Sequence, residues 1–137
     1  MKAVYPVIVS RDLDACKRFY TSLFGFRSLF EVDFYLHLAR EDGVQLGFVH
    51  DQHASIPDGW RRPAAGVFIT IETDEVNELH ERARALDMEI AYPLLDEEWG
   101  QRHFMVRDPN DLLVDVVKLI PPTPAFMERY GLAVQSP

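Results

Sequence analysis

The chain repeats one pattern of secondary structure, and this internal repeat constrains its fold more than any other feature. In each half, an apolar β-rich segment precedes a stretch with helical periodicity, and short strand-like segments follow. The apolar residues that recur at i, i+3, i+7 and i+10 are Leu13, Cys16, Tyr20 and Leu23 in the first half and Val76, Leu79, Ala83 and Leu86 in the second. Two copies are too few for a solenoid, so the repeat predicts a duplicated fold with pseudo-twofold symmetry.

The first copy is predicted over residues 4–50. Its helix should begin after Asp12, whose carboxylate can accept from amides of the first turn, and should end at Gly25, which tolerates the left-handed conformation. Asp42 and Gly43 form a hairpin signal between two apolar runs. The strands of this copy are expected over residues 4–10, 27–32, 34–40 and 44–49.

The second copy is predicted over residues 67–119, after a linker over residues 51–66 that contains Pro57, Gly59 and Pro63. Thr73 or Asp74 should cap its helix. The strands are expected over residues 67–72, 90–94, 101–107 and 112–119, with a turn at 108–111 and a short helix over 125–130 in the tail 121–137.

Aligning the two copies shows where they differ in length. Leu13 and Val76 lie 63 residues apart, whereas Asp42-Gly43 and Asn110-Asp111 lie 68 apart, so the second copy is five residues longer after its helix begins. The expected structure is one α+β domain over residues 1–120, in which duplicated βαβββ modules form a curved mixed sheet around a cavity.

Composition excludes several classes of function. The net charge of −8 and the pI near 5.0 argue against binding to nucleic acid or to an anionic membrane surface. Cys16 is the single cysteine, so an intramolecular disulfide and a cysteine-based zinc cluster are excluded. No apolar run reaches the roughly 20 residues that span a bilayer, and the N-terminal residues lack the apolar stretch of a secretion signal. A cytoplasmic location is expected.

Short motifs in both copies resemble one known superfamily. These motifs are Asp12-Leu13-Asp14, Phe19-Tyr20, Leu23-Phe24-Gly25-Phe26, Trp99-Gly100-Gln101-Arg102 and Asp108-Pro109-Asn110-Asp111. In this order they resemble the vicinal oxygen chelate superfamily, which includes glyoxalase I, extradiol dioxygenases, fosfomycin resistance proteins and bleomycin-binding proteins. The last two motifs are similar to the Trp-Gly-x-Arg and Asp-Pro-x-Gly signatures of the bleomycin-resistance-like branch.

The resemblance also implies where a metal ion would be bound. In metal-using members each half supplies one ligand on its first strand and one on its last strand. The corresponding positions here are Tyr5 and Gly47 in the first copy and Phe68 and Asp115 in the second. Asp115 is the one credible ligand among them, and a single carboxylate cannot hold a catalytic divalent ion. No metal and no cofactor are therefore predicted.

Strand alternation predicts the lining of the cavity. Val67, Ile69 and Ile71 should pack on the helices, which leaves Phe68 and Thr70 on the cavity face. Asp115 should likewise point away from Val114 and Val116. The predicted ligand-binding residues are Tyr5, Val7, Phe68, Thr70, Trp99, Arg102, Phe104 and Asp115. Arg102 could alternatively pair with Asp115, Glu72 or Glu98.

The predicted function is that of a metal-free protein that sequesters or carries a small organic ligand of aromatic or cationic character. The sequence contains no nucleophile or phosphate-binding motif, so no catalytic residue is assigned. One alternative is a lyase or dioxygenase of the same superfamily with a non-standard metal site, and another is an interaction module whose pocket is vestigial. A metal site at His50 and His53 in the linker is a further open alternative. The resemblance implies a homodimer.

Overall fold

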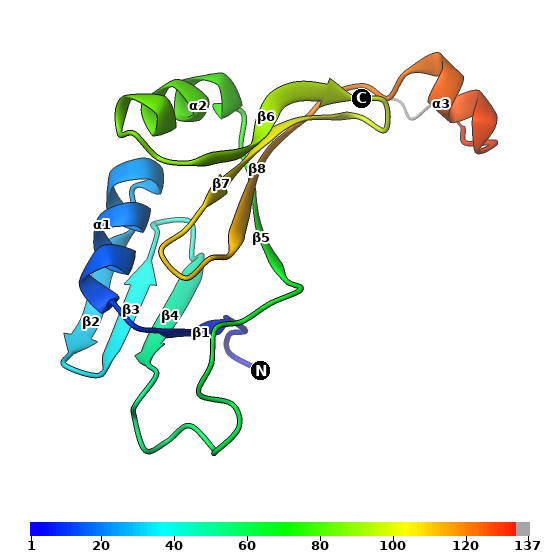
Figure 1. Cartoon of the computed structure of the whole chain (residues 1–137). Helices are drawn as coiled ribbons and strands as arrows, with labels where there is room; N and C mark the ends of the chain where they lie inside the picture. Colours follow the sequence, from blue (N-terminus) through cyan, green and yellow to red (C-terminus); the bar gives the residue numbers. More distant parts are fainter. Residues whose placement is uncertain (134–137) are drawn as a thin grey trace. The chain divides into compact units, whose positions relative to one another are not determined.

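Each copy of the repeat forms a four-stranded mixed sheet in the computed structural model, which describes residues 1–133 (Figure 1). The chain divides into two units. The first unit comprises Met1–Val67 with Asp108–Leu112, and the second comprises Phe68–Arg107 with the chain from Leu113 onward. The predicted α+β fold with two βαβββ modules is confirmed.

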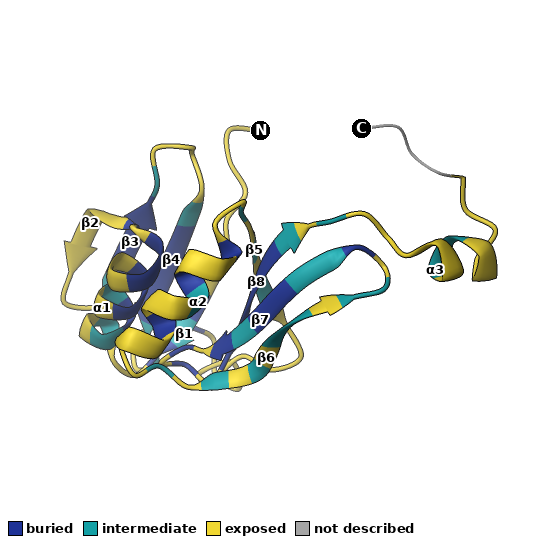
Figure 2. Cartoon of the chain, turned by 90° about the horizontal axis from the view of Figure 1, so that it is seen from above, coloured by how far each residue is buried: buried dark blue, intermediate teal, exposed yellow. Residues whose placement is uncertain are grey.

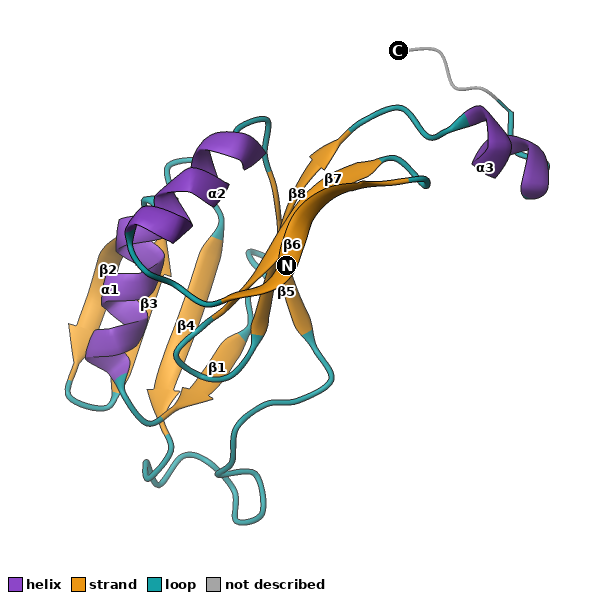
Figure 3. Cartoon of the chain, turned by 45° about the horizontal axis from the view of Figure 1, so that its top comes forward, coloured by secondary structure: helices purple, strands orange, loops and turns teal. Residues whose placement is uncertain are grey.

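In the first unit the strand order is β1-β4-β3-β2, with β1 parallel to β4 and the other neighbours antiparallel. The helix α1 lies on one face of this sheet (Figure 3). The elements are β1 (Val7–Ser10), α1 (Leu13–Phe24), β2 (Arg27–Val32), β3 (Tyr35–Ala39) and β4 (Gln45–His50).

Both predicted caps of α1 are confirmed. The Asp12 carboxylate accepts from the Ala15 amide at 2.9 Å, and Gly25 ends the helix with φ of 72°. The buried face of α1 includes Tyr20, whose ring contacts Phe48 of β4 at a centroid distance of 5.3 Å. Tyr20 also donates its hydroxyl to Asp108 at 2.8 Å, which ties the turn 108–112 into the first unit.

In the second unit the order is β5-β8-β7-β6, again with the first pair parallel. Its elements are β5 (Phe68–Glu72), α2 (Val76–Ala85), β6 (Ile90–Glu97), β7 (Gln101–Arg107), β8 (Leu113–Leu119) and α3 (Pro124–Arg129). The short helix α3 begins after Thr123 and consists of exposed and half-buried residues (Figure 2). Arg129 pairs with Glu98 at 2.6 Å, which fastens α3 to the β6–β7 turn.

The start of α2 differs from the prediction. The N-cap is Glu75, not Thr73 or Asp74, and its side chain makes no capping hydrogen bond. The Thr73 hydroxyl accepts from the Glu75 amide at 3.0 Å, so it closes a turn just before the helix instead of capping it. Leu86 follows the last residue of α2 and is exposed, so the buried face of α2 is formed by Val76, Leu79 and Ala83.

The parallel pairs give the two units one common register. Val7 pairs with Gly47 in the first unit, and Thr70 pairs with Asp115 in the second. These pairs repeat the spacings of 63 and 68 residues found in the sequence. Both β2 and β6 begin with the first spacing, so the five additional residues of the second copy lie in the β6–β7 hairpin.

Candidate functional site

The face of the second sheet that points away from α2 combines exposed aromatic and buried polar side chains. The strand register places Thr70, Asp115 and Met105 side by side on this face, with Phe68 and His103 two residues along on their strands. Phe68 and Thr70 are exposed, whereas His103 and Asp115 are buried. The predicted site residues Phe68, Thr70 and Asp115 therefore share one face.

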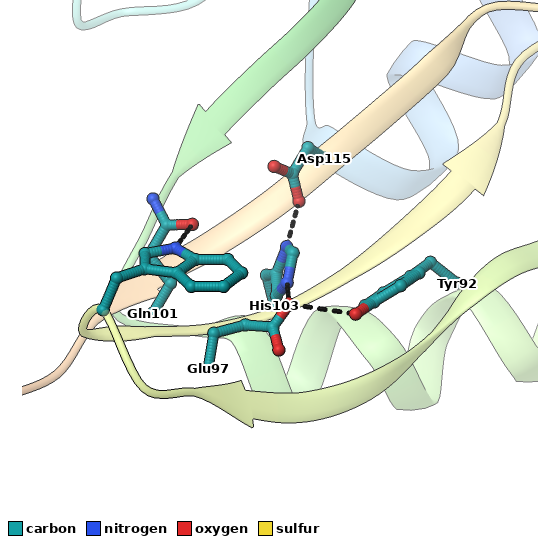
Figure 4. A network of polar contacts seen from close by, with 6 residues as sticks. Tyr92, Glu97, Gln101, His103 and Asp115 are labelled. Atoms are coloured by element: carbon teal, nitrogen blue, oxygen red, sulfur yellow. Dashed lines mark hydrogen bonds and ion pairs between the residues drawn. The ribbon is translucent and has the colours of Figure 1, made fainter. Parts of the chain in front are cut away.

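His103 lies between two carboxylates on this face (Figure 4). Its Nδ1 is 2.7 Å from Oδ1 of Asp115, and its Nε2 is 3.0 Å from Oε2 of Glu97. Tyr92 donates its hydroxyl to the same Glu97 oxygen at 2.9 Å. We call these four residues the His103 cluster.

The cluster favours the protonated form of His103. Burial alone would lower the pKa of its imidazole, but the hydrogen bonds and negative charges of Glu97 and Asp115 outweigh burial and raise the pKa above its ordinary value. Both ring nitrogens then donate. The hydrogen bond to Glu97 raises the pKa of Tyr92, because it favours the neutral phenol. A singly charged imidazolium between two carboxylates leaves a net negative charge in the cluster.

Trp99 stands beside the cluster and remains 46% exposed. Its indole Nε1 donates to Oε1 of Gln101 at 2.9 Å, and its ring centroid lies 6.3 Å from that of His103. The sharp turn that presents the indole depends on Gly100, which has φ of 106°. A Cβ at this position would approach the Ile120 carbonyl oxygen to 2.7 Å. The Trp-Gly pair therefore has a local structural reason.

Two predicted site residues point elsewhere. Phe104 is 0% exposed and packs its ring against His80 of α2 at 5.0 Å, so it belongs to the core and does not line the face of Asp115. Arg102 shares the parity of Phe104 along β7. It pairs with Asp96 at 2.7 Å, and its hydrogen bond lowers the pKa of that carboxyl group. The proposed pairings of Arg102 with Asp115, Glu72 or Glu98 are replaced by this one.

The residues that the sequence did not assign to the site are His103, Glu97 and Tyr92. His103 is two residues from Met105, the strand partner of Asp115, so alternation from Asp115 would have identified its face once the β7–β8 register was known. Glu97 and Tyr92 belong to the irregular β6 strand, whose register shifts between Ile90 and Tyr92 and again between Tyr92 and Leu95. Simple alternation gives no reliable face for them.

The first unit has its own histidine-centred network. Tyr5 and Val7, both predicted site residues, are exposed in this unit, and the Tyr5 ring meets His37 edge-on at 4.7 Å. The His37 Nδ1 is 2.8 Å from the Tyr35 hydroxyl, and its Nε2 is 2.7 Å from Oε1 of Gln45. All of these partners of the histidine are neutral side chains.

The residues at the four superfamily positions do not fit a metal ion. Tyr5, Gly47 and Phe68 supply no ligand of the kind that divalent ions prefer, and Asp115 is hydrogen-bonded to His103. Within residues 1–133, no group of three or more His, Cys, Asp or Glu side chains is arranged to hold a metal ion. This also covers the loop histidines.

The loop histidines have separate partners. His50 lies 3.5 Å from Asp51, whereas His53 stacks on Phe34 with ring centroids 4.0 Å apart and bonds to Ser55 at 2.8 Å. The search for membrane spans, limited to the described residues, finds no helix with the length and apolarity to cross a bilayer.

The fold and this sheet face define an α+β protein of two βαβββ modules with polar and aromatic groups on a sheet face that no helix of its own module covers. The chain belongs to the Glyoxalase/Bleomycin resistance protein/Dioxygenase superfamily, whose family model matches residues 2–116. A comparison with curated protein sequences gives no match.

Solved structures with the same fold include three of informative description. A glyoxalase/bleomycin resistance protein/dioxygenase from Nocardioides is 20% identical with a TM-score of 0.71, over 88% of this chain and 85% of that one. TioX from Micromonospora sp. ML1 is 20% identical with a TM-score of 0.70, over 88% and 100%. A lactoylglutathione lyase from Agrobacterium tumefaciens is 23% identical with a TM-score of 0.69, over 86% and 94%. At these identities the likeness establishes the fold alone.

Proposed function

We propose that this protein binds a small organic ligand without a metal ion and sequesters or carries it. The observation that carries the proposal is the half-exposed indole of Trp99 beside the buried, net negative His103 cluster. Exposed Phe68 and Thr70 add an apolar and a polar contact on the same face. Aromatic walls with a few convergent polar groups are typical of ligand sites.

The chemistry of the cluster favours a ligand with an aromatic ring and a cationic group. Oδ1 of Asp115 and Oε2 of Glu97 accept from His103, while the second oxygen of each carboxylate makes no hydrogen bond in the described part of the chain. An ammonium or amidinium group would supply the donors that these oxygens lack. A planar ring would stack on the indole of Trp99, and the overall charge of −8 would attract cations at long range.

The test is a fluorescence titration in a Trp60→Phe background, in which Trp99 is the remaining tryptophan. Bleomycin and ethidium, a planar aromatic cation, serve as probes. We expect saturable quenching that weakens with added salt. Asp115→Asn and Glu97→Gln should each lower the affinity about tenfold, the loss of one charge-assisted hydrogen bond.

Glu98→Gln is the matched control, because Glu98 neighbours Glu97 but pairs with Arg129. It should leave the affinity unchanged. Quenching that is absent with both probes, or that is insensitive to salt and to both substitutions, would contradict the proposed cationic-aromatic ligand.

Two further parts of the proposal are tested on the purified protein. We propose a homodimer located in the cytoplasm, which light scattering and cell fractionation would check. Metal analysis distinguishes the enzyme alternative: a stoichiometric divalent ion, with turnover of a lactoylglutathione-type thioester, would favour a lyase over a binding protein. A dimer that binds neither probe nor metal would favour an interaction module instead.

A further inference from the structure

The two units carry different residues at one equivalent position next to the superfamily's metal-ligand position. Tyr35 pairs with Val49 in the first unit, and His103 pairs with Val117 in the second. Both partners and both central residues are 68 residues apart, the same spacing that relates Gly47 to Asp115. Tyr35 and His103 are therefore equivalent residues, each lying two strand positions from its unit's ligand position on the neighbouring strand.

In the first unit Tyr35 occupies the space that a side chain at position 47 would need. A Cβ built on Gly47 would lie 2.5 Å from the Tyr35 hydroxyl oxygen and 3.2 Å from its Cζ. The hydroxyl is held there by its 2.8 Å hydrogen bond to His37, which in turn bonds to Gln45 at 2.7 Å. Gly47 is thus required for the tyrosine to reach this network, and a carboxylate at this position would collide with it.

In the second unit His103 engages the side chain at position 115 directly. Asp115 is 2.7 Å from Nδ1, and the second ring nitrogen is held by Glu97 at 3.0 Å. A divalent ion could bind Asp115 with a neighbouring ligand only by displacing this imidazole and breaking two charge-assisted hydrogen bonds. The side chains of Phe68 and Thr70 on the adjacent strand offer no compensating ligand set.

We propose that side-chain networks have taken the place of the metal in both units: Tyr35 covers the ligand position at Gly47, and His103 binds the ligand position at Asp115. Gly47, Tyr35 and His103 are positioning residues in this arrangement. The inference rests on the metal-free part of the proposed function and does not depend on which ligand binds.

A double-mutant cycle between Gly47→Ala and Tyr35→Phe tests the first unit by urea denaturation. Gly47→Ala should lower the urea midpoint when Tyr35 is present and lower it by less than about half as much when combined with Tyr35→Phe, which removes the hydroxyl. As a control, Tyr130→Phe at the end of the exposed helix α3 should combine additively with Gly47→Ala. An equal loss in all backgrounds would overturn the proposal for the first unit.

Equilibrium dialysis of the unmodified protein against Zn²⁺, Ni²⁺ and Mn²⁺ tests both units and does not depend on any variant folding. No stoichiometric uptake is expected. One ion per chain, lost in Asp115→Asn, would overturn the proposal. Failure of the Trp99 titration alone would contradict the proposed ligand and leave these two results unaffected, so the two failures can be told apart.

Discussion

Replacing His103 with Gln gives the sharpest test of the second unit. His103 is 3% exposed and bonds to two carboxylates whose side chains are 11% and 16% exposed. Gln can donate to one of them but brings no charge, so two largely buried carboxylates lose their counter-ion. Breaking such a buried pair costs about 3 kcal/mol, which corresponds to roughly 10 °C in the melting temperature of a chain of this size.

The same substitution should change how stability depends on pH. Because the pKa of His103 is raised in the folded state, folding favours its protonated form. Its contribution is complete below the unfolded-state value of about 6.5 and is lost as the pH rises through the higher folded-state pKa. The free-energy difference between the unmodified protein and His103→Gln should therefore be larger at pH 6 than at pH 9.

Urea denaturation of both proteins at the two pH values measures this difference, and the ionisable groups they share cancel. His53→Gln is the control, because His53 contacts the neutral residues Ser55 and Phe34. It should show no such change with pH. A difference for His103→Gln that stays constant, or grows toward pH 9, would refute the assignment of an imidazolium between Glu97 and Asp115.

Three other substitutions test the fold by urea denaturation. Tyr20→Phe removes the buried 2.8 Å hydrogen bond to the Asp108 carboxylate and should cost about 2 kcal/mol; a cost near zero would mean that this bond does not hold the turn 108–112. Asp12→Ala removes the cap on the Ala15 amide and should cost about 1 kcal/mol, while no loss would show that α1 is set by packing alone. Asp87→Gly should stabilise the chain by about 0.5 kcal/mol, because Asp87 has φ of 58°, and a loss would contradict the idea that this backbone position favours glycine.

Local signals predicted most of the fold. The ends of α1 follow from Asp12 and Gly25, and the strand β7 begins and ends as the sequence indicates. The face of Asp115 also followed from alternation with its apolar neighbours, because the face of a regular strand can be read from a few consecutive residues.

The parts of the site that were not predicted depend on contacts between distant residues. Phe104 looked like a pocket residue because it is aromatic, and only the β7–β8 register assigns it to the core. The partner of His103 on β8 is twelve residues away, and the face of Glu97 depends on bulges in β6. Pairing and bulges are set by tertiary packing, so a single sequence leaves them open.

The longer β6–β7 hairpin shows how a duplicated protein can acquire a new property in one half. The hairpin that contains the additional residues also supplies Glu97 and Trp99, whereas the corresponding β2–β3 connection is short. A single insertion could thus have broken the chemical equivalence of two once-identical modules while leaving both sheets intact. Ligand preference in such a protein would be heritable as one contiguous loop, open to exchange between relatives without redesign of the modules that bear it.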